Sequence, residues 1–368
     1  MIDVHRPVLI MAGGTGGHVF PALAVADELR SRGIPVVWLG TRAGIEARLV
    51  PQAGYPIEWM SITGLRGKNT ITLLLAPVRI VLACWQALVV LLKRKPCVVL
   101  GMGGFVSGPG GLMAWLIRKP LLVHEQNAIA GLTNKILVKF SSVVLQAFPG
   151  VFNEAITTGN PVRKSICEIT VPEDRFAQRY ENDDGRDQSR LRLLVIGGSL
   201  GAVKLNELMP QALAKIDPAQ RPEVIHQTGV KNIDTAKTLY SDAAVSAKVE
   251  AFIDDMPAVY AWADLVICRA GAMTVFELAS AGIASILVPY PHAVDDHQTQ
   301  NALYLQTSGA AIIKQQDDLS ADWLVEVIND FTANRHKLLD MAVAARKLAL
   351  PDSARIIADA CLTAGGII

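Results

Sequence analysis

Residues 8–21 read VLIMAGGTGGHVFP, and this stretch decides the fold class. A short apolar run predicts a buried strand, four glycines then flank Thr15, and His18 follows them. Glycines in such a turn let the backbone approach a ligand closely, and the amides at the start of a helix converge where anionic groups bind. The stretch therefore predicts a strand, a phosphate-binding turn and a helix.

The helix after this turn is expected from Pro21 to Arg32, with Pro21 in its first turn and Gly33 as its C-terminal cap. A further helix is expected from about Gly110. Other apolar runs read as strands: VVWLG at 36–40, CVVLG at 97–101 and PLLVHE at 120–125. This alternation of strands and helices predicts βαβ units around a parallel sheet.

The same pattern restarts in the second half of the chain. Residues 191–213, LRLLVIGGSLGAVKLNELMPQAL, are again an apolar strand, a glycine turn and a helix. Gly159-Asn160-Pro161 lies between the halves, and we place the hinge near Pro161. The polar stretch ENDDGRDQSR at 181–190 predicts an exposed loop. We therefore expect two Rossmann-like halves with a cleft between them.

Length and composition agree with this organisation. The 368 residues are enough for two domains, 51% of them are hydrophobic, and the net charge of +1 does not indicate nucleic acid as a partner. The five cysteines are scattered and form no C-x-x-C pair, which favours reduced, mostly buried thiols in a cytoplasmic protein. The first strand comes so early that no signal peptide is expected.

Residues 71–95, ITLLLAPVRIVLACWQALVVLLKRK, form the most hydrophobic segment. Its length would admit a membrane span, but Pro77 and Arg79 interrupt it, and it lies between two α/β units that must share one side of a membrane. Arg79, Gln86 and Lys93 are seven residues apart and share one narrow face of a helix. Besides a span, two interpretations stay open: a helix buried in the fold, or an interfacial helix that touches lipid.

Two more glycine loops follow strands, GMGGFVSGPGG at 101–111 and GGSLGA at 197–202. Loops on both halves favour a cleft that binds a phosphate-bearing ligand, although glycine turns also serve packing alone. A dinucleotide-dependent dehydrogenase is one alternative, but it would need a carboxylate at the end of the second strand. That strand ends in WLGTR, where Arg42 would suit only a cofactor with a 2′-phosphate.

A carboxylate does occur in residues 268–282, CRAGAMTVFELASAG. The apolar run LVIC leads through Arg269-Ala270-Gly271 into a predicted helix that carries Glu277. At this position a carboxylate can accept hydrogen bonds from both hydroxyls of a ribose while nearby amides hold phosphates. The alternative is a first-turn acid that is favoured only by the helix dipole.

Together these motifs resemble the MurG family, the UDP-N-acetylglucosamine transferases that complete the lipid-linked disaccharide precursor of peptidoglycan. The motifs that carry the resemblance cover nearly the whole chain in order: GGTGGHVFPALAVA, GLRGK, GMGGFVSGPGG, HEQNAIAGLTNK, QAFPG, GNPVR, GGSLGA, FIDDM, CRAGAMTVFE and DHQTQNA. Several of them are long and unusual, so the resemblance is specific. The chain departs from the family where its glycine loop often reads GGSQGA, because Leu200 replaces the amide.

The resemblance implies an α/β fold of the GT-B type, with two Rossmann-like domains whose parallel sheets face a central cleft. Residues 1–160 would form the N-terminal domain, which binds the lipid acceptor and faces the membrane. Residues 161–346 would form the C-terminal domain, which binds UDP-N-acetylglucosamine, and residues 347–368 a helical segment that packs back toward the N-terminal domain. Family members are usually held to the membrane by an apolar, basic-edged surface of the N-terminal domain, which favours lipid contact for residues 71–95.

The resemblance also implies which residues contact the UDP-sugar. Glu277 would bind the ribose, and Gln298 is aligned through its DHQ motif and the nearby Asn301. Carried over motif by motif, the contacts are Thr15, Gly16, Gly17, Asn127, Arg163, Ser199, Ile253, Ala272, Met273, Thr274, Val275, Phe276, Glu277 and Gln298.

The reaction implied is an inverting glycosyl transfer, which needs a base for the acceptor hydroxyl and charge stabilisation for the departing diphosphate. His18 is the candidate base because it closes the first glycine loop and an imidazole can take a proton near neutral pH. A structural role in the loop is the alternative, and His124 is the second candidate. The chain contains no D-x-D motif, so helix amides, Ser199 and Arg163 are expected to act without a metal, and no cofactor is expected.

The expected function is transfer of N-acetylglucosamine to the C4 hydroxyl of the muramyl sugar of undecaprenyl-pyrophosphoryl-N-acetylmuramyl-pentapeptide, which converts lipid I to lipid II. A UDP-sugar epimerase of similar architecture and a non-catalytic membrane scaffold are the alternatives. The implied partners are UDP-N-acetylglucosamine, the lipid-linked acceptor, an anionic membrane surface met through residues 71–95, and proteins of cell-wall synthesis and division, but not nucleic acid. The implied location is the cytoplasmic face of the bacterial cell membrane, as a peripheral protein.

Overall fold

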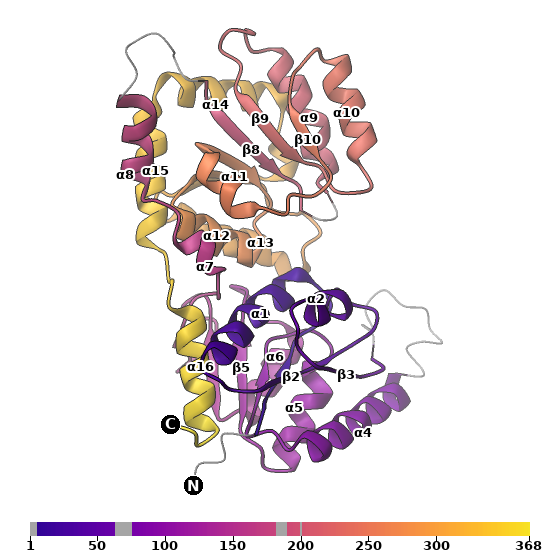
Figure 1. Ribbon diagram of the computed structural model, residues 1–368. Coiled ribbons are helices and arrows are strands. Elements are labelled where there is room, and N and C mark those ends of the chain that lie inside the picture. The colour runs from indigo at the N-terminus through magenta and orange to yellow at the C-terminus, as the bar shows by residue number, and fades with distance from the viewer. Residues whose placement is uncertain (1–5, 63–75, 182–189, 199–200) are drawn as a thin grey trace. The chain divides into compact units, whose positions relative to one another are not determined.

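The computed structural model describes residues 6–62, 76–181, 190–198 and 201–368. By its internal contacts the chain divides into two compact units. Unit 1 comprises Met1–Arg163 and Leu350–Ile368, and unit 2 comprises Lys164–Ala349. Each unit is built on one parallel sheet with helices around it (Figure 1), so the predicted pair of Rossmann-like folds is confirmed. Most of the polar stretch that was predicted as an exposed loop lies outside the described residues.

Unit 1 contains a seven-stranded sheet in the order β3-β2-β1-β4-β5-β6-β7. Its strands are β1 (Val8–Met11), β2 (Val36–Gly40), β3 (Ile57–Trp59), β4 (Val98–Gly101), β5 (Leu121–Glu125), β6 (Val143–Gln146) and β7 (Ile156–Thr157). β1 pairs in parallel with both β2 and β4, so that Val8 stands opposite Val36 and Val98. The central strands are short and almost wholly apolar because helices cover both faces of the sheet.

The helices of unit 1 pack on both faces of its sheet (Figure 1). They are α1 (Gly16–Ser31), α2 (Glu46–Gln52), α4 (Ala76–Arg94), α5 (Ser107–Leu116), α6 (Leu132–Leu137), the 3₁₀ turn η1 (Val138–Phe140) and α16 (Ser353–Ala364). Successive strand residues point to opposite faces. Val8 and Ile10 therefore pack in one core cluster with α1 and α16, whereas Leu9 and Met11 pack in another with α4 and α5.

The start of α1 differs from the prediction. The helix begins at Gly16 and not at Pro21, because Gly14 (φ +94°) turns the chain and Thr15, in an extended conformation, is the N-cap residue. Pro21 therefore lies inside the helix, where its missing N–H leaves the carbonyl of Gly17 without the usual helical hydrogen bond. The glycine loop and the helix thus overlap in sequence.

The start of α5 also lies earlier than predicted, at Ser107 and not near Gly110. Gly103 and Gly104, with φ of +93° and +83°, complete the turn after β4, and the chain is helical soon afterwards. The end of α1 lies one residue earlier than predicted, at Ser31 with Arg32 as the C-cap residue, and Gly33 adopts the left-handed conformation (φ +73°) that ends the helix.

Unit 2 contains a six-stranded parallel sheet in the order β10-β9-β8-β11-β12-β13. Its strands are β8 (Arg192–Ile196), β9 (Glu223–Gln227), β10 (Lys248–Glu250), β11 (Leu265–Cys268), β12 (Ala284–Leu287) and β13 (Ala311–Ile313). Its helices are α7 (Lys164–Cys167), α8 (Pro172–Phe176), α9 (Val203–Ala214), α10 (Ile233–Asp242), α11 (Met256–Trp262), α12 (Ala272–Ala281), α13 (His297–Gln306), α14 (Ala321–Ala333) and α15 (Arg335–Lys347). Three short helical turns, η2 (Ala177–Glu181), η3 (Val294–Asp296) and η4 (Gln316–Asp318), complete the unit.

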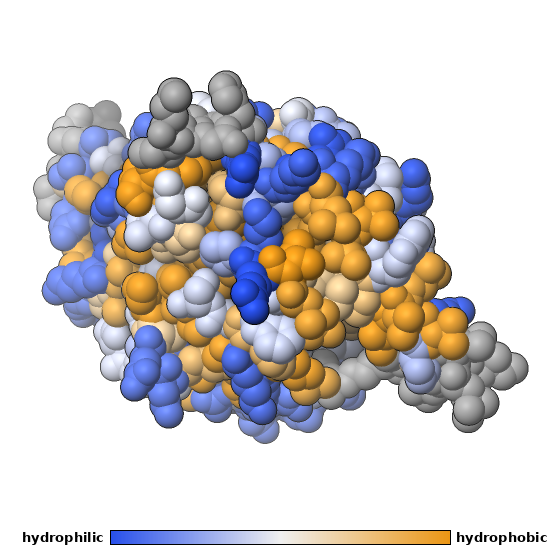
Figure 2. Space-filling model, turned by 90° about the horizontal axis from the view of Figure 1, so that it is seen from below, coloured by the Kyte–Doolittle hydropathy of each residue, from blue (hydrophilic) through white to orange (hydrophobic). Residues whose placement is uncertain are grey.

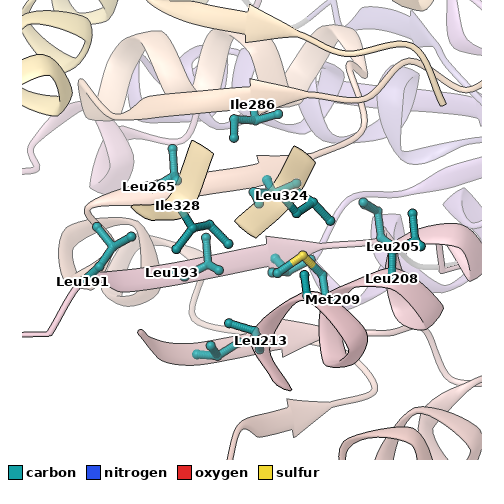
Figure 3. Packing of buried hydrophobic residues seen from close by; sticks show 14 of the residues in the cluster. Leu191, Leu193, Leu205, Leu208, Met209, Leu213, Leu265, Ile286, Leu324 and Ile328 are labelled. Carbon is teal, nitrogen blue, oxygen red and sulfur yellow. The ribbon is translucent and has the colours of Figure 1, made fainter. Parts of the chain in front are cut away.

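The core of unit 2 lies between its sheet and the helices α9 and α14. Figure 3 shows Met209 of α9 and Leu324 of α14 among the side chains that meet Leu193 and Leu265 of the sheet. These residues come from four elements, of which β11 and α14 are far in sequence from β8 and α9, and all are buried. This core holds the strand ends of unit 2 in fixed positions.

All five cysteines lie in the described part of the chain, and all are free thiols, as predicted. Cys268 and Cys361 are buried and the other three are half-buried, so the expectation of mostly buried thiols is met only in part. Burial raises the pKa of every one of them, which keeps the thiols protonated and poorly reactive.

Candidate functional site

In each unit the strand order reverses at one point, and open α/β sheets bind ligands at the carboxyl ends of the strands on either side of such a point. In unit 1 this point lies between β1 and β4, and in unit 2 it lies between β8 and β11. The three glycine loops follow β1, β4 and β8, and the motif with Glu277 follows β11. The candidate loops therefore stand at the strand ends where ligands of this fold bind.

The two glycine loops of unit 1 pack tightly against each other. Gly103 and Gly104 have positive φ angles, a conformation that other residues rarely adopt. A side chain at Gly104 would collide with the backbone of Gly13, and a side chain at Gly103 would meet the ring of His18. Only glycine therefore fits at these two positions, and the contact helps to hold His18 in place.

Thr15, Gly16 and Gly17 lie at the N-terminus of α1. Thr15 is the N-cap residue and the two glycines begin the first turn, where the amide N–H groups have no partner within the helix. Thr15 and Gly17 are exposed and Gly16 is half-buried. These three predicted donor contacts thus lie together at a helix end that favours negative charge.

Sequence analysis missed Glu46, whose buried carboxylate supports the first loop. It accepts hydrogen bonds from the backbone N–H of Gly14 (2.9 Å), from that of Thr41 (3.0 Å) and from the hydroxyl of Thr41 (2.7 Å). A Cβ at Gly13 or Gly44 would meet this carboxylate. The available signal was a lone acid among small residues just after the second strand, which is typical of a buried carboxylate held by backbone donors.

His18 lies in the first turn of α1 and is half-buried. Its Nδ1 is 3.0 Å from the side-chain oxygen Oε1 of Gln126, which follows β5. Among the described residues its other ring nitrogen, Nε2, has no hydrogen-bond partner. His18 therefore has one nitrogen engaged with the protein and one that can reach a ligand.

His124, the second candidate base, is unsuitable for that role. The ring is fully buried, and its Nε2 lies 3.1 Å from both the hydroxyl of Thr158 and the carbonyl oxygen of Gly159. Its Nδ1 lies 3.2 Å from Nε2 of Gln126. Burial lowers the pKa of His124 to about 4, so the ring is neutral near pH 7. With both nitrogens occupied and no exposure, it cannot take a proton from a substrate.

The neighbouring Glu125 organises the loop after β5. Its buried carboxylate accepts hydrogen bonds from the backbone of Asn127 (2.9 Å), from the backbone of Gly131 (3.0 Å) and from the amide of Asn134 (2.9 Å). The side chain of Asn127 also donates to it, at 3.3 Å. Asn127, a predicted sugar contact, is therefore half-buried and held in one orientation next to Gln126.

Arg163, the last residue of the first segment of unit 1, ends a loop that passes the same strand end. Asn160 of this loop donates a hydrogen bond to the backbone carbonyl of Gln126 (2.9 Å). Arg163 is half-buried. Unit 1 therefore brings the start of α1, the loop after β5 and the loop that ends in Arg163 to one edge of its sheet.

In unit 2 the loop 197–202 follows β8, and Ser199 lies outside the described residues. Ala272, Met273 and Thr274 form the first turn of α12, and no side chain in the described ranges caps their amides. Because Gly271 is the N-cap residue, these N–H groups are directed toward the strand ends. They can therefore hold an anionic group such as a diphosphate.

Val275 and Phe276 differ from the first three residues of α12. Both side chains are buried, and the ring of Phe276 stacks on Tyr304 at a centroid distance of 5.2 Å. The N–H of Val275 already donates to the carbonyl of Gly271. Any effect of these two residues on a ligand therefore comes through the position and dipole of the helix.

Glu277 lies in the second turn of α12, so the alternative of a first-turn acid is wrong. The carboxylate is half-buried and accepts a hydrogen bond from the hydroxyl of Tyr260 on α11 (3.1 Å). This contact fixes the orientation of the carboxylate. An oriented carboxylate on the helix that follows β11 is suited to accept hydrogen bonds from a diol.

Ile253 and Gln298 are the remaining predicted contacts. The side chain of Ile253 is buried, so a ligand could meet only its backbone. Gln298 is half-buried at the start of α13, and its side-chain oxygen accepts a hydrogen bond from the backbone of Tyr290 (2.9 Å). This bond orients the amide so that its NH₂ group is the end that remains to meet a ligand.

Comparison with known proteins agrees with this arrangement. Residues 8–146 match the glycosyltransferase family 28 N-terminal domain, and residues 192–357 match the glycosyltransferase family 28 C-terminal domain. A protein of Marinobacter nauticus is 51% identical over 98% of this chain and 98% of its own length, and one of Nitrosococcus oceani is 53% identical over 96% and 98%. Both carry the name UDP-N-acetylglucosamine–N-acetylmuramyl-(pentapeptide) pyrophosphoryl-undecaprenol N-acetylglucosamine transferase.

Solved structures show the same relationship. The crystal structure of MurG from Acinetobacter baumannii matches with a TM-score of 0.83 and 40% identity, over 97% of this chain and 99% of that one. A calicheamicin glycosyltransferase matches with a TM-score of 0.69 over 98% and 99%, but at 16% identity this likeness concerns the fold alone.

Two parallel Rossmann-like sheets with ligand loops at their switch points define a glycosyltransferase of the GT-B type. Within that class the chain belongs to the MurG family of glycosyltransferase family 28. The family and the named relatives consist of transferases, so the comparisons give no support to the alternative of a UDP-sugar epimerase.

Proposed function

We propose that this enzyme transfers N-acetylglucosamine from UDP-N-acetylglucosamine to the C4 hydroxyl of the muramyl sugar of a lipid-linked muramyl pentapeptide. The observation that carries this proposal is identity above 50%, over nearly the whole chain, with proteins that bear the name of that transferase. The same motifs lie at the strand ends of both units. The product is the disaccharide-linked lipid used in peptidoglycan synthesis.

Unit 2 is proposed to bind the nucleotide sugar. The amides of Ala272, Met273 and Thr274 would hold the diphosphate, and Glu277, oriented by Tyr260, would accept hydrogen bonds from the ribose hydroxyls. Gln298 and the backbone of Ile253 would contact the remainder of the donor, together with Ser199.

Unit 1 is proposed to bind the acceptor and to supply the base. His18 would take the proton of the attacking hydroxyl while the bond between the anomeric carbon and the diphosphate breaks and UDP leaves with the electron pair. Thr15, Gly16, Gly17 and Asn127 would contact the sugar, and Arg163 would stabilise the negative charge on the departing diphosphate.

The outer face of α4 is proposed to lie on the membrane. Its exposed large apolar residues are Val78, Ile80, Val81, Leu82, Trp85, Val89 and Leu92. Among them Val78, Val81, Trp85, Val89 and Leu92 follow the spacing of three or four that places residues on one face of a helix. Figure 2 shows a broad apolar area on this end of unit 1 with hydrophilic residues beside it. An exposed apolar area of this kind marks a surface that meets lipid or another protein. By length and composition α4 is also the helix, among the described residues, that could cross a membrane.

The buried inner face of α4 favours a position of the helix on the membrane surface over a position across the membrane. Ala83, Ala87, Val90 and Leu91 are buried against the sheet of unit 1, so the helix is part of the fold. Beside it, a cavity of about 280 Å³ opens between α4, α5 and α6 and is lined mainly by apolar residues such as Ile80, Phe105 and Ile136. Leu73, Leu74 and Leu75 belong to the segment 71–95 for which lipid contact is expected, and they lie outside the described residues.

The basic residues beside the apolar face of α4 carry less free charge than the sequence suggests. Lys93 and Arg94 both pair with Glu58, at 2.9 Å and 2.6 Å, so part of their charge is neutralised. Arg79 and Lys95 are exposed and remain candidates for contact with anionic lipid. With this surface on lipid, the enzyme would be a peripheral protein of the cytoplasmic membrane face, where proteins of cell-wall synthesis and division could dock.

Incubation with UDP-N-acetylglucosamine and a lipid-linked muramyl pentapeptide tests the proposal. Formation of the lipid-linked disaccharide is expected, and conversion of the nucleotide sugar without acceptor would instead indicate an epimerase. A second arm contains a chelator, in which turnover should continue. Loss of all turnover in chelator and recovery with magnesium would overturn the expectation that amides and Arg163 suffice for the diphosphate.

A further inference from the structure

A chain of hydrogen bonds leads from His18 into the core of unit 1. Nδ1 of His18 lies 3.0 Å from Oε1 of Gln126, and Nε2 of Gln126 lies 3.2 Å from Nδ1 of His124. Nε2 of His124 lies 3.1 Å from the carbonyl oxygen of Gly159. Two side chains at the end of β5, Gln126 and His124, therefore link the candidate base on α1 to a backbone carbonyl.

Two backbone carbonyls set the direction of every bond in this chain. Nε2 of His124 lies 3.1 Å from the carbonyl oxygen of Gly159, which can only accept, and 3.1 Å from the hydroxyl oxygen of Thr158, which donates its own proton to the same carbonyl (2.9 Å). Nε2 of His124 must therefore carry the proton of that ring, and Nδ1 must be an acceptor. The amide nitrogen of Gln126 therefore donates to Nδ1 of His124. The same nitrogen also lies 3.2 Å from the backbone carbonyl oxygen of His124, so a flipped amide would set two acceptor oxygens against each other.

The inner end of the chain is firmly held. Gly159 has a φ of +77°, and a Cβ there would meet the side chains of Leu350 and Ser353 near the start of α16. The hydroxyl of Ser353 donates to the backbone carbonyl of Thr158 (2.5 Å). Because burial keeps His124 neutral, with the pKa near 4, the ring carries one proton and cannot donate from both nitrogens.

We propose that Gln126 and His124 are positioning residues that hold His18 in one tautomer, with the proton on Nδ1 and the lone pair on Nε2. The side-chain oxygen of Gln126 can only accept, so Nδ1 of His18 must donate to it. Nε2, which has no partner among the described residues, is then the nitrogen that can accept a proton. In a neutral histidine, the hydrogen bond made by one ring nitrogen decides whether the other nitrogen carries the proton.

This proposal rests on the proposed role of His18 as the base and adds how the base is prepared. When the acceptor hydroxyl attacks, its O–H bond breaks and an N–H bond forms at Nε2 of His18, which becomes a cation. The bond from Nδ1 to Gln126 is then charge-assisted and stronger. Gln126 is an amide and takes no proton, so the proton stays on His18 until it leaves to solvent.

The tautomer of His18 can be measured directly, without the reaction. Protein labelled with ¹⁵N-histidine is examined by NMR at a pH at which the rings are neutral, with His18→Gln used to assign the signals. We expect the form with the proton on Nδ1 in the parent protein. In Gln126→Met, which keeps the length of the side chain and removes its amide, we expect the form with the proton on Nε2 to become populated. The parent protein with the proton on Nε2, or an unchanged tautomer in Gln126→Met, overturns the proposal.

Turnover provides the second readout. Gln126→Met should lower kcat roughly tenfold, less than the 10²-fold or greater loss expected on removal of the base itself, with KM for the donor little changed. Gln146→Met is the matched control, because Gln146 is also a buried glutamine beside β5 but makes no side-chain contact with His18 or His124. It should keep both the tautomer and kcat. A fall in kcat of equal size in Gln146→Met would show a general packing effect and overturn the assigned role.

These readouts separate the two proposals. If His18→Ala leaves turnover intact while the tautomer changes as predicted in Gln126→Met, the role of His18 as base fails and the positioning chain stands. If His18→Ala abolishes turnover while Gln126→Met leaves the tautomer unchanged, the base stands and the positioning chain fails.

Discussion

The ring of His18 stands where a side chain at position 103 would lie, since a Cβ on Gly103 would come within 2.5 Å of Nδ1 of His18. Gly103→Ala should therefore displace the ring as well as strain a backbone with a φ of +93°. We expect kcat to fall on the order of 10²-fold, as when a general base is lost, and this is checked by steady-state kinetics on folded protein.

Gly33→Ala is the control for this variant. Gly33 also has a positive φ, +73°, but a Cβ there would meet nothing within 4 Å, and it lies at the far end of α1. It should lower stability by about 1 kcal/mol and leave turnover unchanged. Equal kinetic losses in the two variants would show that strain alone, and not the position of His18, matters.

Substitution of the candidate base is the second prediction. His18→Ala should lower kcat by roughly 10²-fold or more, because a positioned base contributes that much, and should leave the affinity for UDP-N-acetylglucosamine little changed. Kinetics and calorimetric titration with the donor measure the two quantities separately. Loss of donor affinity with kcat retained would make His18 a ligand for the sugar.

The third prediction concerns the ribose contact. Glu277→Ala should weaken UDP binding by on the order of 1–3 kcal/mol, because the hydroxyl donors of the ribose lose their acceptor. The same change also removes one acceptor of the buried Tyr260 hydroxyl. Glu277→Ala combined with Tyr260→Phe removes that second effect, and calorimetry should show the same loss of UDP affinity as in the single variant. Unchanged affinity would leave Glu277 with a structural role only.

The fourth prediction tests the membrane surface. Val81→Gln combined with Trp85→Gln should weaken binding to anionic vesicles roughly tenfold or more, since each inserted apolar side chain contributes on the order of 1–2 kcal/mol. Turnover on a soluble, short-chain acceptor should survive. Val230→Gln is the control, because Val230 in unit 2 is as exposed as Val81, at 67% against 68%. Vesicle binding that is equal in all three proteins would place the lipid contact elsewhere.

The fifth prediction is a loss of stability in acid that depends on His226. This ring is buried in unit 2 against Tyr240, and burial lowers its pKa to about 3. The unfolded chain, in which histidine titrates near pH 6.5, therefore binds more protons than the folded chain between about pH 6.5 and 3. The free energy of unfolding should fall as the pH drops through this window, by several kcal/mol at most.

Chemical denaturation of unit 2 at several pH values measures this effect. His226→Phe combined with Tyr240→Phe should reduce the slope of the free energy of unfolding against pH by the equivalent of about one proton. Tyr240→Phe alone keeps the buried histidine and should keep that slope. An unchanged slope in the double variant would show that other groups cause the acid sensitivity.

The sequence by itself determined the fold class and the positions of the candidate loops along the chain. The run from Val8 to His18 predicts a strand, a glycine turn and the start of a helix. Each of these depends on local conformational preferences, which are set by neighbouring residues and not by the rest of the chain. The repeat of the pattern after Leu191 predicted the second sheet for the same reason. Motifs such as CRAGAMTVFE then linked these turns to a family, because their order is unusual.

Only the tertiary structure decided which residues surround the candidate base. Gln126 meets His18 across 108 positions of sequence, Gly103 leaves room for the same ring, and the carbonyl of Gly159 sets the direction of the hydrogen bonds. Nothing in the local pattern around HEQN distinguishes a glutamine that supports a histidine from one in solvent. Contacts of this kind depend on which strand ends the parallel sheet brings together, and on which polar groups burial then forces to find a partner.

For the surface of α4, too, the sequence determined one part and the tertiary structure another. Its composition predicted a helix that is either buried or in contact with lipid, because apolar residues occur on every side of it. Packing buries its alanines against the sheet and leaves Val81 and Trp85 exposed, so one face of the helix belongs to the core and the other remains a candidate for lipid contact. Which side of an apolar helix meets solvent depends on the neighbouring elements. The hydrophobic effect is non-directional, so burial of any apolar side is favourable.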